Sequence, residues 1–328
     1  MNPFHLRSGR SASGTLLACG SAAVALAAST FAARELPPDA RRDVAAQTPV
    51  LRLGWNADGE APPPLLPQKK PLEVLGSGSE FGEQAILLRR AQVEPWSASL
   101  GTLLNYTNNA GLTPVGQQRD WYLRAGLGVA YTNRVKGALF VDVALTHDLF
   151  RYAKFDALDF DHTRIEAGLL FQWPGLDGAF FATRYAYERI AEPFGGSLFD
   201  SHRVILQLQK VWKISRGQKV FAGVSADVAL SADPSAAQRD EYSSIVGYTA
   251  RLTQRFSAQA SYRLGWYRYD EGGRADWNQI AAAGLTLDAT DWARLSITTS
   301  LSRNTSNRHF AEYDNFVAGL GLNLHLSF

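Results

Sequence analysis

Arginines and carboxylates recur at alternate positions along residues 120–295, and they are the side chains best suited to do chemistry in this chain. A guanidinium offers a planar fork of N–H donors that matches a carboxylate or a phosphate. Because successive strand side chains point to opposite faces, residues spaced by two share a face. The shared face carries Arg124, Arg164, Arg184, Arg251, Arg263 and Arg294, with Asp142 and Glu166 among its acids. These residues predict either a solute-binding wall or a wall braced by its own ion pairs.

Aspartates and histidines form a second group of candidates. Asp156, Asp159, Asp161 and His162 fall in one predicted loop, where they could bind calcium or support hydrolysis of an ester. The loop lacks the glycine of a calcium site, so we favour a hydrated loop. We interpret the group formed by His309, Glu312 and Asp314 in the same way. Ser201 and His202 are adjacent, so within a strand they cannot form a nucleophile–base pair on one face.

Several other classes of site have no support in the sequence. We find no glycine-rich phosphate loop and no His-Glu-x-x-His zinc motif, so no cofactor and no metal is expected. Basic and acidic residues are interleaved throughout, which argues against nucleic acid as a partner.

The elements that must position the arginines are strands. In the last thirteen residues, 316–328, every second side chain is apolar and most of the others are small or polar. This period of two predicts a strand with one apolar and one hydrated face, long enough to cross a bilayer when tilted. Eleven earlier segments between residues 97 and 301 alternate in the same way, so we predict twelve strands. In one of them Trp121 and Tyr131 mark the two ends of the apolar face, as interfacial aromatic residues do.

The predicted connections alternate in length. The short connections are 133–136, 174–178, 215–218, 254–256 and 290–292. The longer ones are 108–119, 148–162, 190–201, 232–241, 270–275 and 303–314. This alternation is typical of an up-and-down barrel whose two ends face different compartments.

The first 95 residues differ from the rest. Residues 1–32 have a basic start, an alanine-rich apolar stretch and small residues near their end, the layout of a secretory signal peptide. They contain Cys19, the only cysteine, and two arginines but no acid. The remaining chain therefore has 31 basic and 31 acidic residues and a net charge of zero. Residues 33–95 are rich in proline and glycine, and they predict a flexible leader or a segment folded into the lumen. Within them only residues 83–90 could form a short helix or strand.

The alternating carboxyl-terminal strand, which ends on Phe328, resembles the closing strand of bacterial outer-membrane β-barrels. The resemblance implies that Phe328 is part of an assembly signal read by the barrel-assembly machinery, and that outer-membrane lipid surrounds residues 96–328. We therefore predict an all-β fold, a transmembrane antiparallel up-and-down β-barrel of about twelve strands. With short turns on the periplasmic side, both termini and the leader would be periplasmic.

Three functions are compatible with such a barrel. The first is a narrow passive channel for small anionic or saccharide solutes, lined by the arginines named above. It resembles in architecture the twelve-stranded channels for acidic oligosaccharides, although no diagnostic motif is present. The second is a closed structural or surface-interaction barrel, whose arginines are paired with acids across the lumen. The third, which we do not favour, is an outer-membrane lipid hydrolase with His162 in its site.

Overall fold

The computed structural model describes residues 38–47, 95–176 and 178–328. The predicted signal peptide, residues 1–32, and the segment 83–90 lie outside these residues. Among the described residues, no helix has the length and apolarity needed to cross a membrane.

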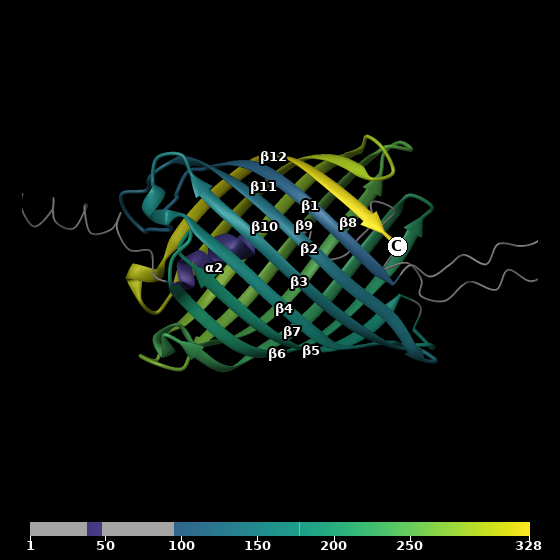
Figure 1. Ribbon diagram of the computed structural model, residues 1–328, viewed down its shortest axis with the longest axis horizontal. Helices are drawn as coiled ribbons and strands as arrows, with labels where there is room; N and C mark the ends of the chain where they lie inside the picture. Colours follow the sequence, from purple (N-terminus) through teal and green to yellow (C-terminus); the bar gives the residue numbers. More distant parts are fainter. Residues whose placement is uncertain (1–37, 48–94, 177) are drawn as a thin grey trace, which may run out of the picture.

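Twelve antiparallel strands form a closed barrel (Figure 1). Each strand pairs with its neighbours in sequence, and β1 closes the barrel on β12, from Ser97 opposite Ser327 to Thr107 opposite Val317. The predicted fold class and the predicted number of strands are therefore confirmed. The strands are β1 (Trp96–Thr107), β2 (Asp120–Lys136), β3 (Leu139–Tyr152), β4 (Phe160–Gln172), β5 (Ala179–Ala191), β6 (Ser197–Ser215), β7 (Gln218–Asp233), β8 (Arg239–Arg251), β9 (Phe256–Tyr269), β10 (Ala275–Asp288), β11 (Ala293–Ser306) and β12 (Tyr313–Ser327).

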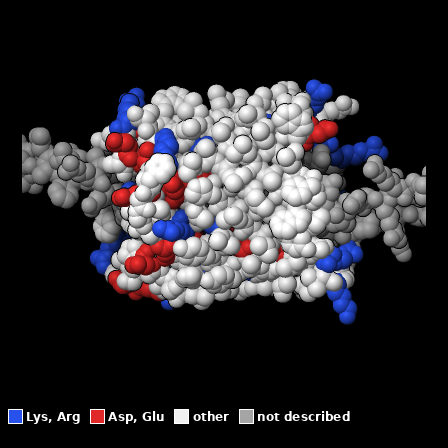
Figure 2. Space-filling model, viewed as in Figure 1, with Lys and Arg blue, Asp and Glu red and all other residues white. Residues whose placement is uncertain are grey.

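The outer surface of the barrel is an apolar belt. Large side chains such as Leu127, Ile165 and Leu320 are exposed there, because the period-two pattern turns one face of each strand outward. Figure 2 shows that Lys, Arg, Asp and Glu gather at the two ends of the barrel and are sparse between them. An apolar band flanked by polar ends is the surface that a lipid bilayer requires of a barrel.

The strands extend further toward the long loops than the sequence predicted. The predicted loop 148–162 is reduced to residues 153–159, because β3 continues to Tyr152 and β4 begins at Phe160. Three of the long connections contain single 3-10 turns, η2 (Asp156–Leu158), η3 (Ser235–Ala237) and η4 (His309–Ala311). The predicted strands end where the outward-facing positions stop being apolar. The backbone hydrogen bonds between strands continue beyond that point. Asp148 and His162, for example, face each other across β3 and β4.

Helix α2 (Pro38–Gln47) lies inside the barrel, at the end that carries the long loops (Figure 1). The sequence did not predict a helix here. Of its two alternatives for residues 33–95, a flexible leader or a segment folded into the lumen, residues 38–47 fit the second. Apart from three alanines, Val44 is the only apolar residue of the helix beyond the initial proline, so no amphipathic stripe announces it. The other residues of the segment 33–95 lie outside the described part of the chain, apart from Pro95.

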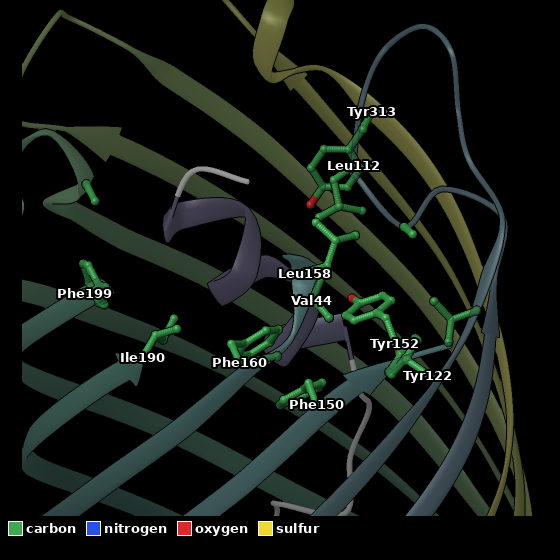
Figure 3. Packing of buried hydrophobic residues seen from close by; sticks show 14 residues of the cluster. Val44, Leu112, Tyr122, Phe150, Tyr152, Leu158, Phe160, Ile190, Phe199 and Tyr313 are labelled. Carbon is green, nitrogen blue, oxygen red and sulfur yellow. The ribbon is translucent and has the colours of Figure 1, made fainter. Parts of the chain in front are cut away.

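The main buried apolar cluster surrounds α2 (Figure 3). Val44 points from the helix toward aromatic side chains of the wall, which include Phe150, Tyr152 and Phe160. The rings of Phe150 and Phe160 are stacked, with centroids 4.3 Å apart. The main apolar cluster of the barrel therefore lies at its long-loop end, where Val44 and Ala45 of α2 pack into it.

Candidate functional site

A chain of polar side chains crosses the inner wall from β2 to β6. Asp142 accepts hydrogen bonds from Thr132 at 2.9 Å and from Arg184 Nε at 2.8 Å. Arg184 also donates to Gln207 at 3.1 Å, and Arg164 is paired with Glu166. These residues meet because they occupy inward positions at similar heights on neighbouring strands. The structure thus brings four of the predicted site residues, Asp142, Arg164, Glu166 and Arg184, into one network.

The other predicted arginines also lie on the inward face. Arg124 pairs with Asp148 at 2.8 Å, and Arg294 pairs with Asp288 at 2.8 Å. Arg263 donates to the Tyr267 hydroxyl at 3.0 Å. Arg251 lies at the short-turn end of β8 and is exposed. The predicted register is therefore right, while contact of these residues with a solute stays a prediction.

Gly126 shows how the wall accommodates these pairs. A Cβ at this position would overlap Oδ1 of Asp148, the atom that accepts the hydrogen bond from Arg124. The absence of a side chain at position 126 therefore makes room for the Asp148 carboxylate.

The two halves of the interior differ in how much of their wall is accessible. We define the short-turn half by the inward residues Ser99, Thr132, Asp142, Arg184, Gln259, Thr286, Asp288, Arg294 and Asn323, all of which are partly accessible. We define the long-loop half by Asn105, Asp148, His162, Glu188, Arg203, Arg239, Asp276, Asn304 and Asn315, all of which are buried. Helix α2 lies in the long-loop half and covers polar wall there. In the short-turn half the accessible side chains lie beside buried inward ones, such as Phe140, Gln209 and Phe221, so that half is accessible only in part.

Two carboxylates of α2 bind arginines in the long-loop half. Asp39 Oδ2 is 2.6 Å from Arg274 Nη1 and 3.3 Å from the Tyr269 hydroxyl. Asp43 Oδ1 accepts from Arg239 Nη2 at 2.8 Å, and its Oδ2 accepts from the Tyr313 hydroxyl at 3.1 Å. Asp39 and Asp43 are four residues apart, so they project from the same face of the helix.

The opposite charges of α2 also have partners. Arg42 donates to Glu241 at 2.7 Å and lies 3.3 Å from Glu188. Arg41 donates to the carbonyl of Ala157 in η2 at 3.1 Å. At the end of the helix, the Gln47 side-chain oxygen accepts from Asn315 at 2.7 Å. The helix is therefore held mainly by polar contacts that come from most sides of the barrel.

Burial opposes the charged forms of two of these groups. It raises the pKa of the Asp43 carboxyl above its ordinary value, although the Arg239 guanidinium acts in the opposite direction. Burial also lowers the pKa of the Arg41 guanidinium. Desolvation therefore opposes part of what the Asp43–Arg239 pair contributes.

The histidine group predicted in the loop 148–162 does not assemble. His162 is in β4, faces the lumen with 1% of its surface exposed, and contacts Glu188 at 2.8 Å. Asp161 pairs with Arg151, and Asp159 accepts from the Tyr152 backbone N–H. His162 cannot reach a lipid from this position, so the proposed hydrolase loses its site. Within the described residues, no three His, Cys, Asp or Glu side chains are grouped to hold a metal ion.

The sequence missed the residues that bind α2. It placed Arg239 and Arg274 in predicted loops, whereas Arg239 begins β8 and Arg274 directly precedes β10. The available signal was that polar or aromatic side chains continue at every second position. Arg239 and Glu241 share one face of β8, Tyr267 and Tyr269 share one face of β9, and both faces point inward. The outward positions there are no longer consistently apolar, so a strand is harder to predict from the sequence.

No protein-family model matches the chain, and no curated protein matches it. Among solved structures, an outer membrane channel from Pseudomonas putida F1 is similar, with a TM-score of 0.51 and 12% identity over 70% of this chain and 95% of that chain. The NanC porin matches with a TM-score of 0.42 and 9% identity over 69% of this chain and 100% of that chain. An anion-selective porin from Comamonas acidovorans matches with a TM-score of 0.39 and 8% identity, over 70% and 98% of the two chains. Only the first similarity is strong enough to support an argument, and it concerns the fold. The chain has the fold of bacterial outer-membrane β-barrels.

Proposed function

We propose that this protein is a passive outer-membrane channel for small polar solutes, with a preference for anionic or saccharide solutes. The observation that carries the proposal is the partly accessible, ion-paired wall of the short-turn half. Asp142, Arg184, Asp288 and Arg294 all keep part of their surface accessible. A barrel of twelve strands is wider than the eight-stranded barrel that side chains fill, so its interior has room for a small solute.

The preference for anions is supported by the charge at the short-turn end. Arg134, Lys136, Lys213 and Arg251 are exposed there, and Figure 2 shows chiefly Lys and Arg at this end of the barrel. A mouth lined by one sign of charge raises the local concentration of the opposite ion. The ion pairs deeper in the wall are nearly neutral, so they would favour polar solutes in general.

A closed structural barrel is the second candidate, and α2 is the observation that favours it. The helix is buried in the long-loop half, and Arg124, Arg164, Arg184 and Arg294 are paired with wall acids. If α2 never leaves this position, solutes could enter the short-turn half without crossing the barrel.

Planar-bilayer conductance separates the two candidates. We expect small or infrequent current steps from the wild-type protein. The double variant Asp39→Arg/Asp43→Arg should conduct several-fold more, because it places like charges against Arg274 and Arg239 and expels α2. Ala46→Arg is the matched control, since Ala46 is the exposed residue of the same helix, and it should behave as wild type. A folded double variant that conducts no current would establish the closed barrel and overturn the channel.

We also propose that the short-turn end, where Phe328 pairs with Trp96, faces the periplasm and carries the assembly signal. Lys154 lies in a long loop and Lys136 at a short turn, and both are exposed. A membrane-impermeant amine reagent applied to intact cells should therefore modify Lys154 and leave Lys136 unmodified. The opposite labelling would reverse the orientation.

A further inference from the structure

Arg239 and Arg274 each present one edge of the guanidinium to α2 and the other edge to the wall. Arg239 Nε donates to Glu241 at 3.0 Å, while Nη2 donates to Asp43. Arg274 Nε donates to Asp276 at 3.0 Å, while Nη1 donates to Asp39. If α2 leaves, the wall acids still orient both guanidinium groups, and one N–H edge of each becomes available.

Tyrosine side chains hold the two guanidinium groups further in place. Arg274 lies over the ring of Tyr269, 4.1 Å from its centroid, and Arg239 lies over the ring of Tyr267 at 4.2 Å. Such stacking fixes the plane of a guanidinium. The hydroxyls of Tyr269 and Tyr313 complete the contacts to Asp39 and Asp43. The wall therefore contains a preformed receptor for two carboxylates.

The contacts between α2 and this receptor can be replaced by those of a competing ligand. The helix buries four charged side chains and little apolar surface, and buried ion pairs contribute little net free energy because desolvation offsets them. Within the described part of the chain, Arg41 Nε and Arg42 Nη1 are buried without a hydrogen-bond partner. Each such atom costs free energy on docking. A soluble ligand that supplies two carboxylates can therefore compete with the helix.

We infer that Arg239, Arg274, Tyr269 and Tyr313 form a binding site for a small dicarboxylate, which the Asp39 and Asp43 side chains of α2 occupy as an internal ligand. The inference rests on the proposed channel only in that a solute must reach the lumen. It goes further by naming the site and the class of ligand, and it makes dicarboxylate binding and α2 docking mutually exclusive.

The test is calorimetric titration of the full-length protein in detergent with adipate, at constant ionic strength. Asp39→Asn/Asp43→Asn removes the internal carboxylates with little change in shape. If α2 occupies the site in nine molecules of ten, this variant should bind adipate about tenfold more tightly than the wild type. Hexanoate, which has a single carboxylate, should bind far more weakly to both proteins.

Two arginine substitutions, Arg239→Gln and Arg274→Gln, are each added to the Asp39→Asn/Asp43→Asn variant. Each should weaken adipate binding by about tenfold or more, since each removes a charge-assisted hydrogen bond. Arg303→Gln, on the outer face of the barrel, is the matched control and should leave the affinity unchanged. If an arginine variant does not fold, Tyr269→Phe and Tyr313→Phe serve instead, and each should weaken binding by about threefold.

Equal adipate affinity in the wild type and in Asp39→Asn/Asp43→Asn would overturn the inference, as would an affinity that these arginine and tyrosine substitutions do not change. Failure of the channel is distinguishable from this result. Adipate binding by a protein that passes no current would remove the channel and keep the site, whereas current without adipate binding would do the reverse.

Discussion

The two halves of the lumen have similar side-chain chemistry but different surroundings. In the long-loop half, Arg203 is fully buried and contacts Asp227 at 2.6 Å and Glu241 at 3.4 Å. In the short-turn half, the Arg294 and Asp288 side chains form a similar pair at 2.8 Å but are 26% and 31% exposed. The difference teaches that an arginine on a barrel wall has a role set by what covers it. Where neighbouring side chains bury it, as at Arg203, it joins a packed core, and where they do not, as at Arg294, it stays partly accessible.

The energetic consequence follows from hydration. A buried ion pair is costly to break because removal of one partner leaves the other charge without water. A hydrated pair loses little because water replaces the missing partner. Similar substitutions in the two halves should therefore have different effects on stability and on transport.

The largest difference in the loss of unfolding free energy is expected between Arg203→Gln and Arg294→Gln. Loss of Arg203 leaves Asp227 without its buried partner and should lower the free energy of unfolding by about 3–5 kcal/mol. Loss of Arg294 should lower it by about 1 kcal/mol or less, because water screens that pair. Urea unfolding of the refolded barrel in lipid vesicles measures both. Equal losses would show that the two halves are equally packed.

Gly126→Ala and Gly101→Ala should also differ in the free energy of unfolding, by a smaller amount, with the larger loss at position 126. The added Cβ at position 126 collides with Asp148 and displaces it from Arg124, at a cost of about 1–3 kcal/mol for overpacking. At position 101 the new Cβ would lie 3.1 Å from Nδ2 of Asn323, the end of a side chain that can move into the more open half. The same unfolding measurement applies, and a larger loss for Gly101→Ala would contradict the comparison.

Ion selectivity should respond to charge in the short-turn half. Arg294→Gln should lower the anion-to-cation permeability ratio by about fourfold, since one unit charge about 10 Å away in water contributes about 0.4 kcal/mol, with opposite sign for the anion and the cation. Reversal potentials under a salt gradient provide the measurement. Arg303→Gln, on the outer face, is the control, and a selectivity that changes equally in both variants would remove Arg294 from the pathway.

The smallest change in the free energy of unfolding is expected for an ion pair outside the lumen. Arg303 and Asp314 are 3.6 Å apart on the outer face near the long loops, with side chains 64% and 67% exposed. Arg303→Ala should leave the free energy of unfolding unchanged within about 0.5 kcal/mol, because solvent screens such a pair. A loss as large as that of Arg203→Gln would mean that exposure does not set the value of these ion pairs.

Much of the barrel could be predicted because its pattern is local. The alternation of residues 316–328 identifies the faces of β12, and similar segments identify the other strands. The inward position of Arg124, Arg184 and Arg294 follows from the same period of two. Their partners were harder to predict, since the choice between an acid of the wall and a solute depends on distances between strands.

The site around α2 could not be predicted, and the reason is separation along the chain. Asp43 contacts Tyr313 across 270 positions, and Arg41 contacts Ala157 across 116 positions. The helix itself has no apolar stripe, so its sequence resembles that of a solvated segment. His162 was misplaced for a related reason, since the strand that carries it continues only because β3 and β5 pair with it.

The sequence by itself therefore determined the architecture. Period-two alternation and connections of alternating length specify a twelve-stranded barrel and the inward face of each strand. Only the tertiary structure decided which inward charges are covered. Closure of the barrel around α2 brings Asp39 and Asp43 onto Arg274 and Arg239, and excludes water from one half of the lumen. That outcome depends on long-range contacts, and local alternation carries no information about them.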